Sequence, residues 1–423
     1  MEKLKTPTGV RLHPLDSLTH KLSMHPRTTS KIYSPSFVMM AFANLFTVSS
    51  FGSFFLFPLF ITDHGGSKAD IGIIMGVFAL SSVLCRPWVS EMVDRIGRKR
   101  SYTIGCLIMS LLSLSYLLFQ GDLAHFYLPL VLVRFLHGIG LAICFTSAFT
   151  YIADIVPEER LNEGIGMFGI TGLMGMAIGP FIAERIIQAY GFSVFFLAAT
   201  GMATLGLLFH LPLSESYAHM SLKSSQSFLS VLMKRRVMTV SLLSLLFGFG
   251  LAASSSFVSP FARELNLAII SPYYISYSLA AIVTRLLGGR LADRLGEYRI
   301  IPYALTMTGI GLLLLIFLGG TMILVLSGLM SGCGHGFLFP CLNSMVIRNE
   351  PIDIRGKITG IFTGGIDAGA FAGSILLGYI GEWIGFRSLF FAAGLALLTG
   401  LGIYKPLMMR YTCLVAKSCK NED

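Results

Sequence analysis

Residues 90–100 read SEMVDRIGRKR, and a near copy, GRLADRLGEYR, occupies residues 289–299. A shift of 199 residues aligns the two stretches. Under this shift, five positions carry the same residue in both copies: Arg86 and Arg285, Asp94 and Asp293, Arg95 and Arg294, Gly97 and Gly296, and Arg100 and Arg299. Charged residues that recur in register between long apolar runs indicate that the chain contains a duplicated unit.

A second repeat supports the duplication. Under a shift of 194 residues, a proline and three glycines recur: Pro157, Gly166, Gly175 and Gly179 match Pro351, Gly360, Gly369 and Gly373. Pro58 and Pro260 also occupy similar positions near the ends of two apolar segments. The sequence therefore predicts two copies of a six-helix unit, joined by a polar segment over residues 213–236.

The composition is typical of a membrane protein. The chain has 423 residues, of which 54% are hydrophobic and only 13% are charged, and its mean hydropathy is +0.73. A soluble protein carries roughly a quarter charged residues. Apolar runs of about 20 residues, long enough to cross a bilayer as helices, recur along the chain.

These runs predict an all-α membrane protein with twelve transmembrane helices in two pseudo-symmetric bundles. The predicted spans are 36–62, 70–92, 101–120, 126–152, 162–188, 192–212, 237–262, 271–292, 299–318, 321–347, 357–381 and 386–409. The predicted parts of the chain are a cytoplasmic leader that need not be ordered (1–35), a first bundle (36–212), a cytoplasmic central loop (213–236), a second bundle (237–409) and a cytoplasmic tail (410–423).

The net charge of +10 is explained by topology. If the N-terminus is cytoplasmic, most lysines and arginines fall on the cytoplasmic side, including Arg98, Lys99 and the run 234–236, which is the bias that orients membrane helices. Nucleic-acid binding is therefore not expected. The seven cysteines form no C-x-x-C pair, and neither a disulfide nor a metal site is predicted.

The repeated loop resembles the hallmark of the major facilitator superfamily, G-x-x-x-D-R-x-G-R-[RK]-x. This chain has Ser90 in place of the first glycine. The matching residues are Asp94, Arg95, Gly97, Arg98 and Lys99 in the first copy and Gly289, Asp293, Arg294 and Gly296 in the second, which departs from the pattern at Glu297. The resemblance implies two bundles that rock about a central cavity, in a protein that is usually monomeric.

The same resemblance implies that the two loops form a conformational latch, because in the family this Asp faces the positive N-terminal end of a helix in the other half. The latch would comprise Ser90, Asp94, Arg95, Gly97 and Arg98, with Gly289, Asp293, Arg294 and Gly296. Ordinary cytoplasmic charge is the alternative, which explains the basic residues but not the repeated Asp and Gly.

The fifth predicted helix is similar to the antiporter motif of the family through Gly166, Gly175, Gly179 and Pro180, although Ala183 and Glu184 replace its final two glycines. Closely spaced glycines let membrane helices approach each other, and the proline is expected to bend the helix. The similarity implies an exporter. General packing of small residues is the alternative.

Four ionisable residues within apolar segments are candidates for proton coupling. Arg134 lies in a segment similar to one that the family links to proton transfer, where His137 replaces the usual Gln, and an unpaired Arg there costs about 2.5–3.5 kcal/mol. We expect Glu184 to lie at a similar depth and to pair with it. His335 and Asp367 form a second candidate pair near the bilayer centre. The alternatives are simple neutralisation of charge, a hydrogen-bonded buried His, and a site for a substrate cation at Asp367.

Aromatic and polar residues on the helices that line the family's cavity predict a site for an amphipathic organic molecule. The candidates are Asn44, Phe51, Phe55, His137, Ser256, Tyr277 and Asn343.

The sequence has no P-loop, no H-E-x-x-H and no G-x-S-x-G motif, so it predicts neither an ATP-driven pump nor an enzyme. We expect a secondary transporter without a cofactor, driven by a proton gradient, that exports a small organic drug or metabolite from a bacterial cell across its inner membrane. The alternatives are an importer of a metabolite or organic anion, with Arg134 as the anion contact, and a transporter-like receptor or assembly factor.

Overall fold

The computed structural model describes the backbone of residues 32–216, 228–348, 350 and 352–419. Within these ranges it describes all side chains except those of residues 159, 162, 228–229, 288–294, 352–353, 355–356 and 406–419. All regular structure in the described part of the chain is helical. The all-α class predicted from the sequence is therefore confirmed.

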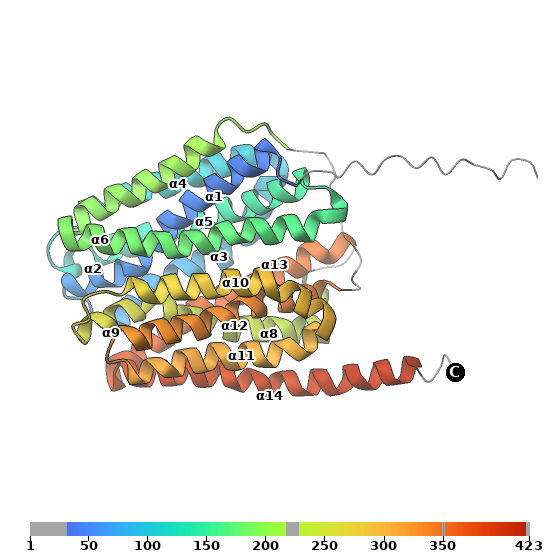
Figure 1. Ribbon diagram of the computed structural model, residues 1–423. Helices are drawn as coiled ribbons and strands as arrows, with labels where there is room; N and C mark the ends of the chain where they lie inside the picture. The colour runs from blue at the N-terminus through green and yellow to red at the C-terminus, as the bar shows by residue number, and fades with distance from the viewer. Residues whose placement is uncertain (1–31, 217–227, 349, 351, 420–423) are drawn as a thin grey trace, which may run out of the picture.

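The helices of the first half are α1 (Pro35–Ser53), η1 (Phe54–Leu56), α2 (Phe57–Asp63), α3 (Lys68–Ile96), α4 (Arg98–Ser115), η2 (Tyr116–Leu118), α5 (Leu123–Ile155), η3 (Glu158–Arg160) and α6 (Leu161–His210). Those of the second half are α7 (Phe228–Leu232), α8 (Arg235–Ser256), α9 (Val258–Glu264), α10 (Ser271–Leu295), α11 (Glu297–Leu314), η4 (Leu315–Phe317), α12 (Thr321–Ile347), α13 (Ile352–Ile384) and α14 (Phe386–Cys419). Figure 1 draws the first set in blue to green above the second set in yellow to red.

Ten helical stretches among the described residues are long and apolar enough to cross a membrane. One of them, Glu163–His210, has 48 residues and covers the two predicted spans 162–188 and 192–212. The backbone breaks inside it at Gly191, whose φ of 79° is not helical. The equivalent glycine under the 194-residue shift, Gly385, has a φ of 100° and separates α13 from α14. The same left-handed turn therefore stands between the last two long segments of each half.

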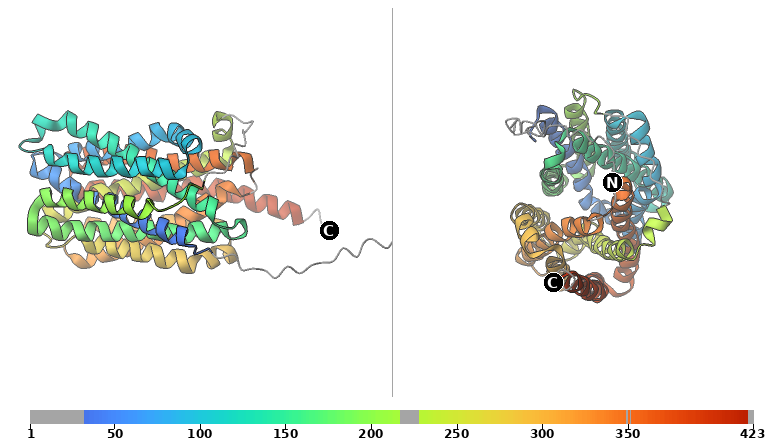
Figure 2. Two further views of the ribbon diagram at one scale, coloured as in Figure 1. Left: turned by 90° about the horizontal axis from the view of Figure 1, so that it is seen from above. Right: turned by 90° about the vertical axis from the view of Figure 1, so that its right-hand side faces the viewer.

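The helices pack mainly within their own half of the chain. α1 packs on α6, and α3 and α4 pack on α5; in the second half α8 packs on α13, and α10 and α11 pack on α12. The two largest contacts between the halves are those of α3 with α13 and of α6 with α10, and smaller ones join α2 with α9 and α3 with α8. The end-on view in Figure 2 has the same two colour groups lying against each other.

Glycines set the closest approaches between helices. A Cβ at Gly179 of α6 would lie 2.2 Å from the Ser49 carbonyl oxygen of α1, and a Cβ at Gly369 of α13 would lie 1.9 Å from the Leu245 carbonyl oxygen of α8. Gly328, Gly332 and Gly336 bring α12 against α10 in the same way. Because lipid supplies no hydrophobic force between helices, such backbone contacts are a main source of their association.

Candidate functional site

An ion pair joins the two halves where α3 meets α13. The Arg86 guanidinium bonds the Asp367 carboxylate, and its Nη1 donates to the Thr363 hydroxyl at 2.7 Å. The Ser82 hydroxyl donates to the same carboxylate at 2.9 Å. Both charged side chains are less than one third exposed, at 29% and 27%. The pairing explains how an Arg and an Asp are tolerated so far from the helix ends.

The structure does not bring the predicted partners His335 and Asp367 together. The His335 Nδ1 shares a hydrogen bond with the Tyr277 hydroxyl, and the His335 ring lies edge-on to Phe247 at a centroid distance of 5.0 Å. Among the described residues, Asp367 instead forms hydrogen bonds with Arg86 and Ser82. The sequence placed both residues at a similar depth in the membrane, but depth does not determine the direction in which a side chain points.

Arg134 is almost completely buried, at 1% exposure, in a cage of aromatic rings. Its guanidinium carbon lies 4.5 Å from the ring centroid of Phe78, 5.2 Å from that of Phe57 and 5.4 Å from that of Phe54, and its Nη2 lies 3.4 Å from the Met75 sulfur. Ring faces attract a guanidinium most strongly when water is excluded. The predicted contact with Glu184 is absent from the described residues.

His137, one turn along α5 from Arg134, is equally buried. Its Nδ1 lies 3.3 Å from the Tyr116 hydroxyl, and its ring packs edge-on against Phe54 and Phe78. These contacts connect it to the aromatic cage of Arg134.

Glu184 instead contacts the start of α10. Its carboxylate accepts hydrogen bonds from the backbone N–H groups of Ile270 and Ser271, the latter at 3.1 Å. Those N–H groups have no partner inside the helix, and a negative charge at a helix N-terminus is stabilising. Glu184 therefore ties α6 of the first half to α10 of the second.

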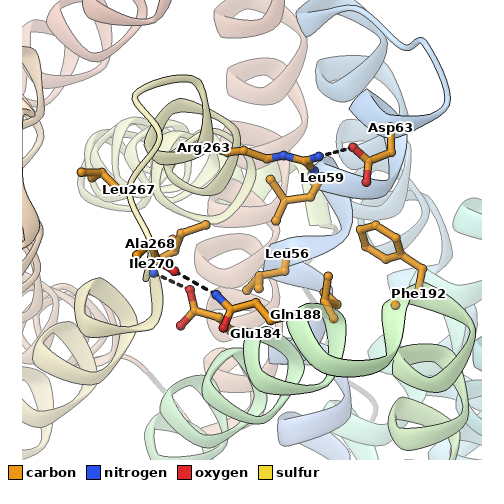
Figure 3. Close-up of a pocket in the computed structure, with 12 residues that line it drawn as sticks. Leu56, Leu59, Asp63, Glu184, Gln188, Phe192, Arg263, Leu267, Ala268 and Ile270 are labelled. Atoms are coloured by element: carbon orange, nitrogen blue, oxygen red, sulfur yellow. Dashed lines mark hydrogen bonds and ion pairs between the residues drawn. The ribbon is translucent and has the colours of Figure 1, made fainter.

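A pocket of about 370 Å³ lies beside Glu184, between α2, α6 and the segment that joins α9 to α10. Figure 3 draws its two further links between the halves: the ion pair of Asp63 with Arg263, and the hydrogen bond from the Gln188 amide to the Ala268 carbonyl oxygen, 2.8 Å long. We call this end of the molecule, with α2 and α9, the α2–α9 end.

Further polar contacts close the α2–α9 end. Lys68 Nζ lies 3.3 Å from the Glu264 carboxylate, and the backbone N–H of Lys68 donates to Glu382 at 2.9 Å. The Ser259 hydroxyl donates to the Phe55 carbonyl oxygen at 2.8 Å. At the opposite end, which contains Gly97 and is called the Gly97 end, the structure shows no hydrogen bond or ion pair that joins a described residue of one half to a described residue of the other.

The predicted latch lies at the Gly97 end. Gly97 has a φ of 99° and ends α3, and Ser90 is an exposed residue of α3. Asp94 is 68% exposed and lies 3.5 Å from Arg98, whereas Arg95 pairs with Glu91. Among the described residues Asp94 does not reach the other half, and because the Asp293 side chain lies outside them, the latch stays a prediction.

Arg98 and the start of α4 are held within the first half. The Arg98 Nε lies 2.9 Å from Asp154 of α5. The carboxylate of Glu215 accepts from the backbone N–H groups of Arg98 and Lys99, at 2.7 Å and 3.1 Å. Glu215 of the first half thus caps the N-terminal end of α4.

In the second copy of the loop, Gly296 has a φ of 80° at the start of α11. The side chains of Gly289, Asp293 and Arg294 lie outside the described residues. Glu297, where the pattern departs, is buried and accepts from Arg348 at 2.5 Å and from Ser344 at 2.7 Å.

The glycines of the antiporter-like segment have different surroundings. Gly175 and Gly179 lie directly against α1, while a Cβ at Gly166 would meet nothing within 4 Å. Pro180 lies inside α6 and packs near Gly52 of α1. The second and third glycines and the proline therefore contact α1, whereas a seal at this contact stays a prediction.

The remaining cavity candidates are mostly packed against other side chains. The Asn44 amide donates to the Thr171 hydroxyl at 2.8 Å, the Phe51 ring stacks on Phe78 at 5.5 Å, and the Phe55 ring lies 5.4 Å from Tyr274 of the other half. Ser256 is fully buried. Asn343 is half-buried, and its side-chain oxygen has no hydrogen-bond partner in the described residues.

Sequence reasoning missed the roles of Ser82, Arg86 and Thr363 at the central ion pair. The 199-residue repeat had singled out Arg86, but nothing in the spacing linked it to a carboxylate 281 residues away. A search for a counter-charge to every intramembrane carboxylate would have made Arg86 a candidate.

Comparison with known proteins gives one consistent result. The family described as Major Facilitator Superfamily matches residues 37–349 and 273–410. The staphylopine export protein of Staphylococcus aureus is 22% identical, over 81% of this chain and 88% of that protein. The multidrug resistance protein MdtG of Enterobacter lignolyticus is 23% identical, over 86% and 88%. The crystal structure of a mutant of the nucleoside transporter NupG superposes with a TM-score of 0.71 at 16% identity, over 88% of this chain and 99% of that one.

Proposed function

Because the chain belongs to the major facilitator superfamily and is thus a multi-pass secondary transporter rather than an enzyme, we propose that it exports a small organic compound in exchange for protons. Protonation of Asp367 is the coupling step in this proposal. The observation that carries it is the Arg86–Asp367 ion pair, which links α3 of the first half to α13 of the second.

The proposed architecture has twelve transmembrane helices in two bundles. Dividing α6 at Gly191 and adding α10 to the ten apolar helices gives this number. The equivalent positions of Gly191 and Gly385 favour the division, since each separates the last two long segments of its half.

We propose that the Gly97 end faces the cytoplasm of a bacterial cell, with both termini on that side and the protein in the inner membrane. Arg98, Lys99 and Arg100 stand at this end, together with Arg235 and Arg236 at the start of α8. Basic residues next to membrane helices are retained on the cytoplasmic side. The α2–α9 end, closed by Glu184 and the Asp63–Arg263 pair, then faces outward.

The proposed cycle uses the charge on Asp367. While it is ionised, its pairing with Arg86 holds α3 to α13; when a proton neutralises it, the Coulombic attraction disappears and the two helices can separate. Glu184 is a second proposed proton carrier, because protonation would weaken its bonds to the start of α10. Arg134 and His335 remain predicted coupling residues.

Export is favoured over import by two observations. Gly175, Gly179 and Pro180 pack tightly on α1 in the segment that resembles the antiporter motif. The relatives reported above are named for staphylopine export and for multidrug resistance. The protein is proposed to act as a monomer, with the proton gradient as its energy source and no bound cofactor.

The proposal is tested in proteoliposomes that contain a trapped pH-sensitive dye and carry an imposed pH gradient. Ethidium, a cation, and 1-naphthoate, an anion, serve as probes. We expect protons to move against at least one probe in the wild type. Asp367→Asn should abolish this exchange, whereas Glu163→Gln, which removes an exposed carboxylate paired with Arg160, should not.

Movement of protons together with the probe would favour import and contradict export. Unchanged exchange in Asp367→Asn, with the same amount of reconstituted protein, would exclude Asp367 as the coupling residue. No probe-dependent proton movement in the wild type, for these probes or for those named below, would contradict the transport proposal as a whole.

A further inference from the structure

Arg285 of α10 is the repeat equivalent of Arg86, but its surroundings have lost every polar partner that Arg86 has. Under the 199-residue shift Ser82 corresponds to Ala281, and under the 194-residue shift Thr363 and Asp367 correspond to Gly169 and Leu173. The Arg was therefore kept in both halves, while the hydroxyls and the carboxylate were kept in only one.

The position of Arg285 repeats that of Arg86. The Arg86 side chain reaches from α3 across to Thr363 of α13. A Cβ added at Gly169 of α6, the equivalent of Thr363, would lie 2.7 Å from the Arg285 Nη1. The guanidinium of Arg285 thus crosses between the halves in the same way, at the contact of α10 with α6.

No counter-charge accompanies Arg285 in the described residues. None of their carboxylates lies within 4 Å of it, whereas Arg86 pairs with Asp367. The Nε atoms of both arginines are buried without a hydrogen-bond partner. Asp293, whose side chain is outside the described part, stands eight residues further along α10, about 12 Å in axial rise. The Arg285 side chain as a whole is partly exposed, so its terminal nitrogens can bind an anion that a ligand supplies.

The groups around Arg285 suit an aromatic ligand. Its guanidinium carbon lies 5.8 Å from the ring centroid of Phe339, and Tyr277 and His335 are near enough to interact with its charge. Asn343 lies one turn beyond Phe339 on α12, and its side-chain oxygen is buried without a hydrogen-bond partner in the described residues. An apolar wall with a few convergent polar groups is typical of a small-molecule site.

We propose that Arg285 binds the carboxylate of an aromatic organic anion, which is the substrate class of this transporter. The inference rests on the proposed function and adds the charge of the substrate to it. Arg86, satisfied by Asp367, serves the coupling step, whereas Arg285 serves recognition. The planar guanidinium suits this role because its parallel N–H groups match the two oxygens of a carboxylate.

The test compares carboxylates with neutral amides of the same shape. Binding to the purified full-length protein is measured by calorimetry for benzoate and benzamide, 1-naphthoate and 1-naphthamide, and indole-3-acetate and indole-3-acetamide. We expect at least one carboxylate to bind about tenfold more tightly than its amide, as a charge-assisted hydrogen bond provides. Equal binding within all three pairs would overturn the proposal.

Three variants locate the preference. Arg285→Gln should remove it, whereas Arg185→Gln, which removes an exposed arginine of α6 beside Phe181, should keep it. Leu173→Asp restores the missing carboxylate at the position equivalent to Asp367. We expect this variant to lose the preference although Arg285 is intact, because the new side chain occupies the guanidinium.

The Leu173→Asp variant also keeps the test decisive if Arg285→Gln does not fold. If Arg285→Gln cannot be purified, loss of the preference in a folded Leu173→Asp protein supports the site, and retention of it overturns the site. Failure of this inference is distinguishable from failure of the transport function. Proton counterflow with ethidium, without any preference for carboxylates, would contradict the Arg285 site alone.

Discussion

The two halves of the molecule share their packing but differ in their charges. Gly175 and Gly179 set α6 against α1, and their equivalents Gly369 and Gly373 set α13 against α8. By contrast, Arg98 pairs with Asp154 in the first half, whereas the equivalent positions hold Glu297 and Arg348, a pair of reversed polarity. The central arginines differ further, since only Arg86 has a carboxylate partner among the described residues.

The helix contacts that the halves share are those that the fold requires, whereas the charges that differ are candidates for a role in function. Close helix contacts need a glycine wherever two backbones touch, so the duplication preserved them. An ion pair keeps its Coulombic attraction when the two charges are exchanged, so the pair can be retained with reversed polarity. A missing partner is a different kind of change, and it points to a task that one half performs and the other does not.

The largest expected effect comes from breaking the shared packing. Gly179→Leu and Gly373→Leu should each prevent recovery of folded protein, because a Cβ at these positions lies within 3.0 Å of backbone atoms of α1 and α8. Overpacking of this kind costs about 3 kcal/mol or more. The measurement is the yield of monodisperse protein from the membrane.

The matched controls are Gly166→Leu and Gly360→Leu, at equivalent positions where a Cβ would meet nothing within 4 Å. Both should give normal yields. If only one of Gly179→Leu and Gly373→Leu lowered the yield, the two halves would have the same helix contacts but would depend on them differently for stability.

The second-largest effect is expected from removal of Arg86, which distinguishes its proposed role in coupling from the role of Arg285 in recognition. Arg86→Gln leaves Asp367 without its cation and should lower substrate-driven proton exchange at least about tenfold, with a loss of about 1–2 kcal/mol in stability after allowance for partial exposure. The double change Arg86→Gln with Asp367→Asn should recover the thermal midpoint but not the exchange. Full exchange in Arg86→Gln would contradict the division of roles between Arg86 and Arg285.

The third effect tests the pairs of reversed polarity. Glu297→Arg or Arg348→Asp alone places two like charges together and should lower stability by about 1–2 kcal/mol. The two changes combined recreate the arrangement of Arg98 and Asp154 and should restore the thermal midpoint to near the wild-type value. A double variant as unstable as the single ones would mean that the surroundings of Glu297 are specific for that polarity.

The smallest effect concerns the α2–α9 end. Arg263 and Asp63 are 47% and 33% exposed, and pairs of this kind contribute about 0.2–1 kcal/mol. Arg263→Gln should raise labelling of Leu56→Cys by N-ethylmaleimide a few-fold, because Leu56 is buried beside the pocket. Arg160→Gln, at the other end, should not change it. An unchanged rate in Arg263→Gln would show that the remaining contacts keep this end closed.

Much of the fold followed from the sequence because hydropathy and repeats are properties of contiguous segments. The predicted span 70–92 became α3, Lys68–Ile96, and the span 299–318 matches α11 with η4. Helix ends moved by several residues, since caps such as the Ser67–Asp70 box lie outside the apolar run. The helix α14 continues to Cys419, beyond the predicted span 386–409.

The candidate site was harder to predict, because depth in a helix does not define the direction of a side chain. Arg134 and Glu184 were expected to meet, but Arg134 points into a ring cage and Glu184 points to the start of α10. Ring faces and backbone N–H groups are partners that no charge count in a sequence includes. The partner of Asp367 lies in the other half, and the packing of α3 on α13 identifies it as Arg86 among the possible cations.

The seam between α3 and α13 has a further mechanical consequence. A Cβ at Gly72 would lie 2.4 Å from the Ser374 carbonyl oxygen, and Gly72 also faces Gly378. Backbones that touch without interlocking side chains can turn against each other while no rotamer has to change. In the proposed cycle, the two halves turn about this seam beside the central charges, and a bulky residue introduced at Gly72 is expected to block that rotation.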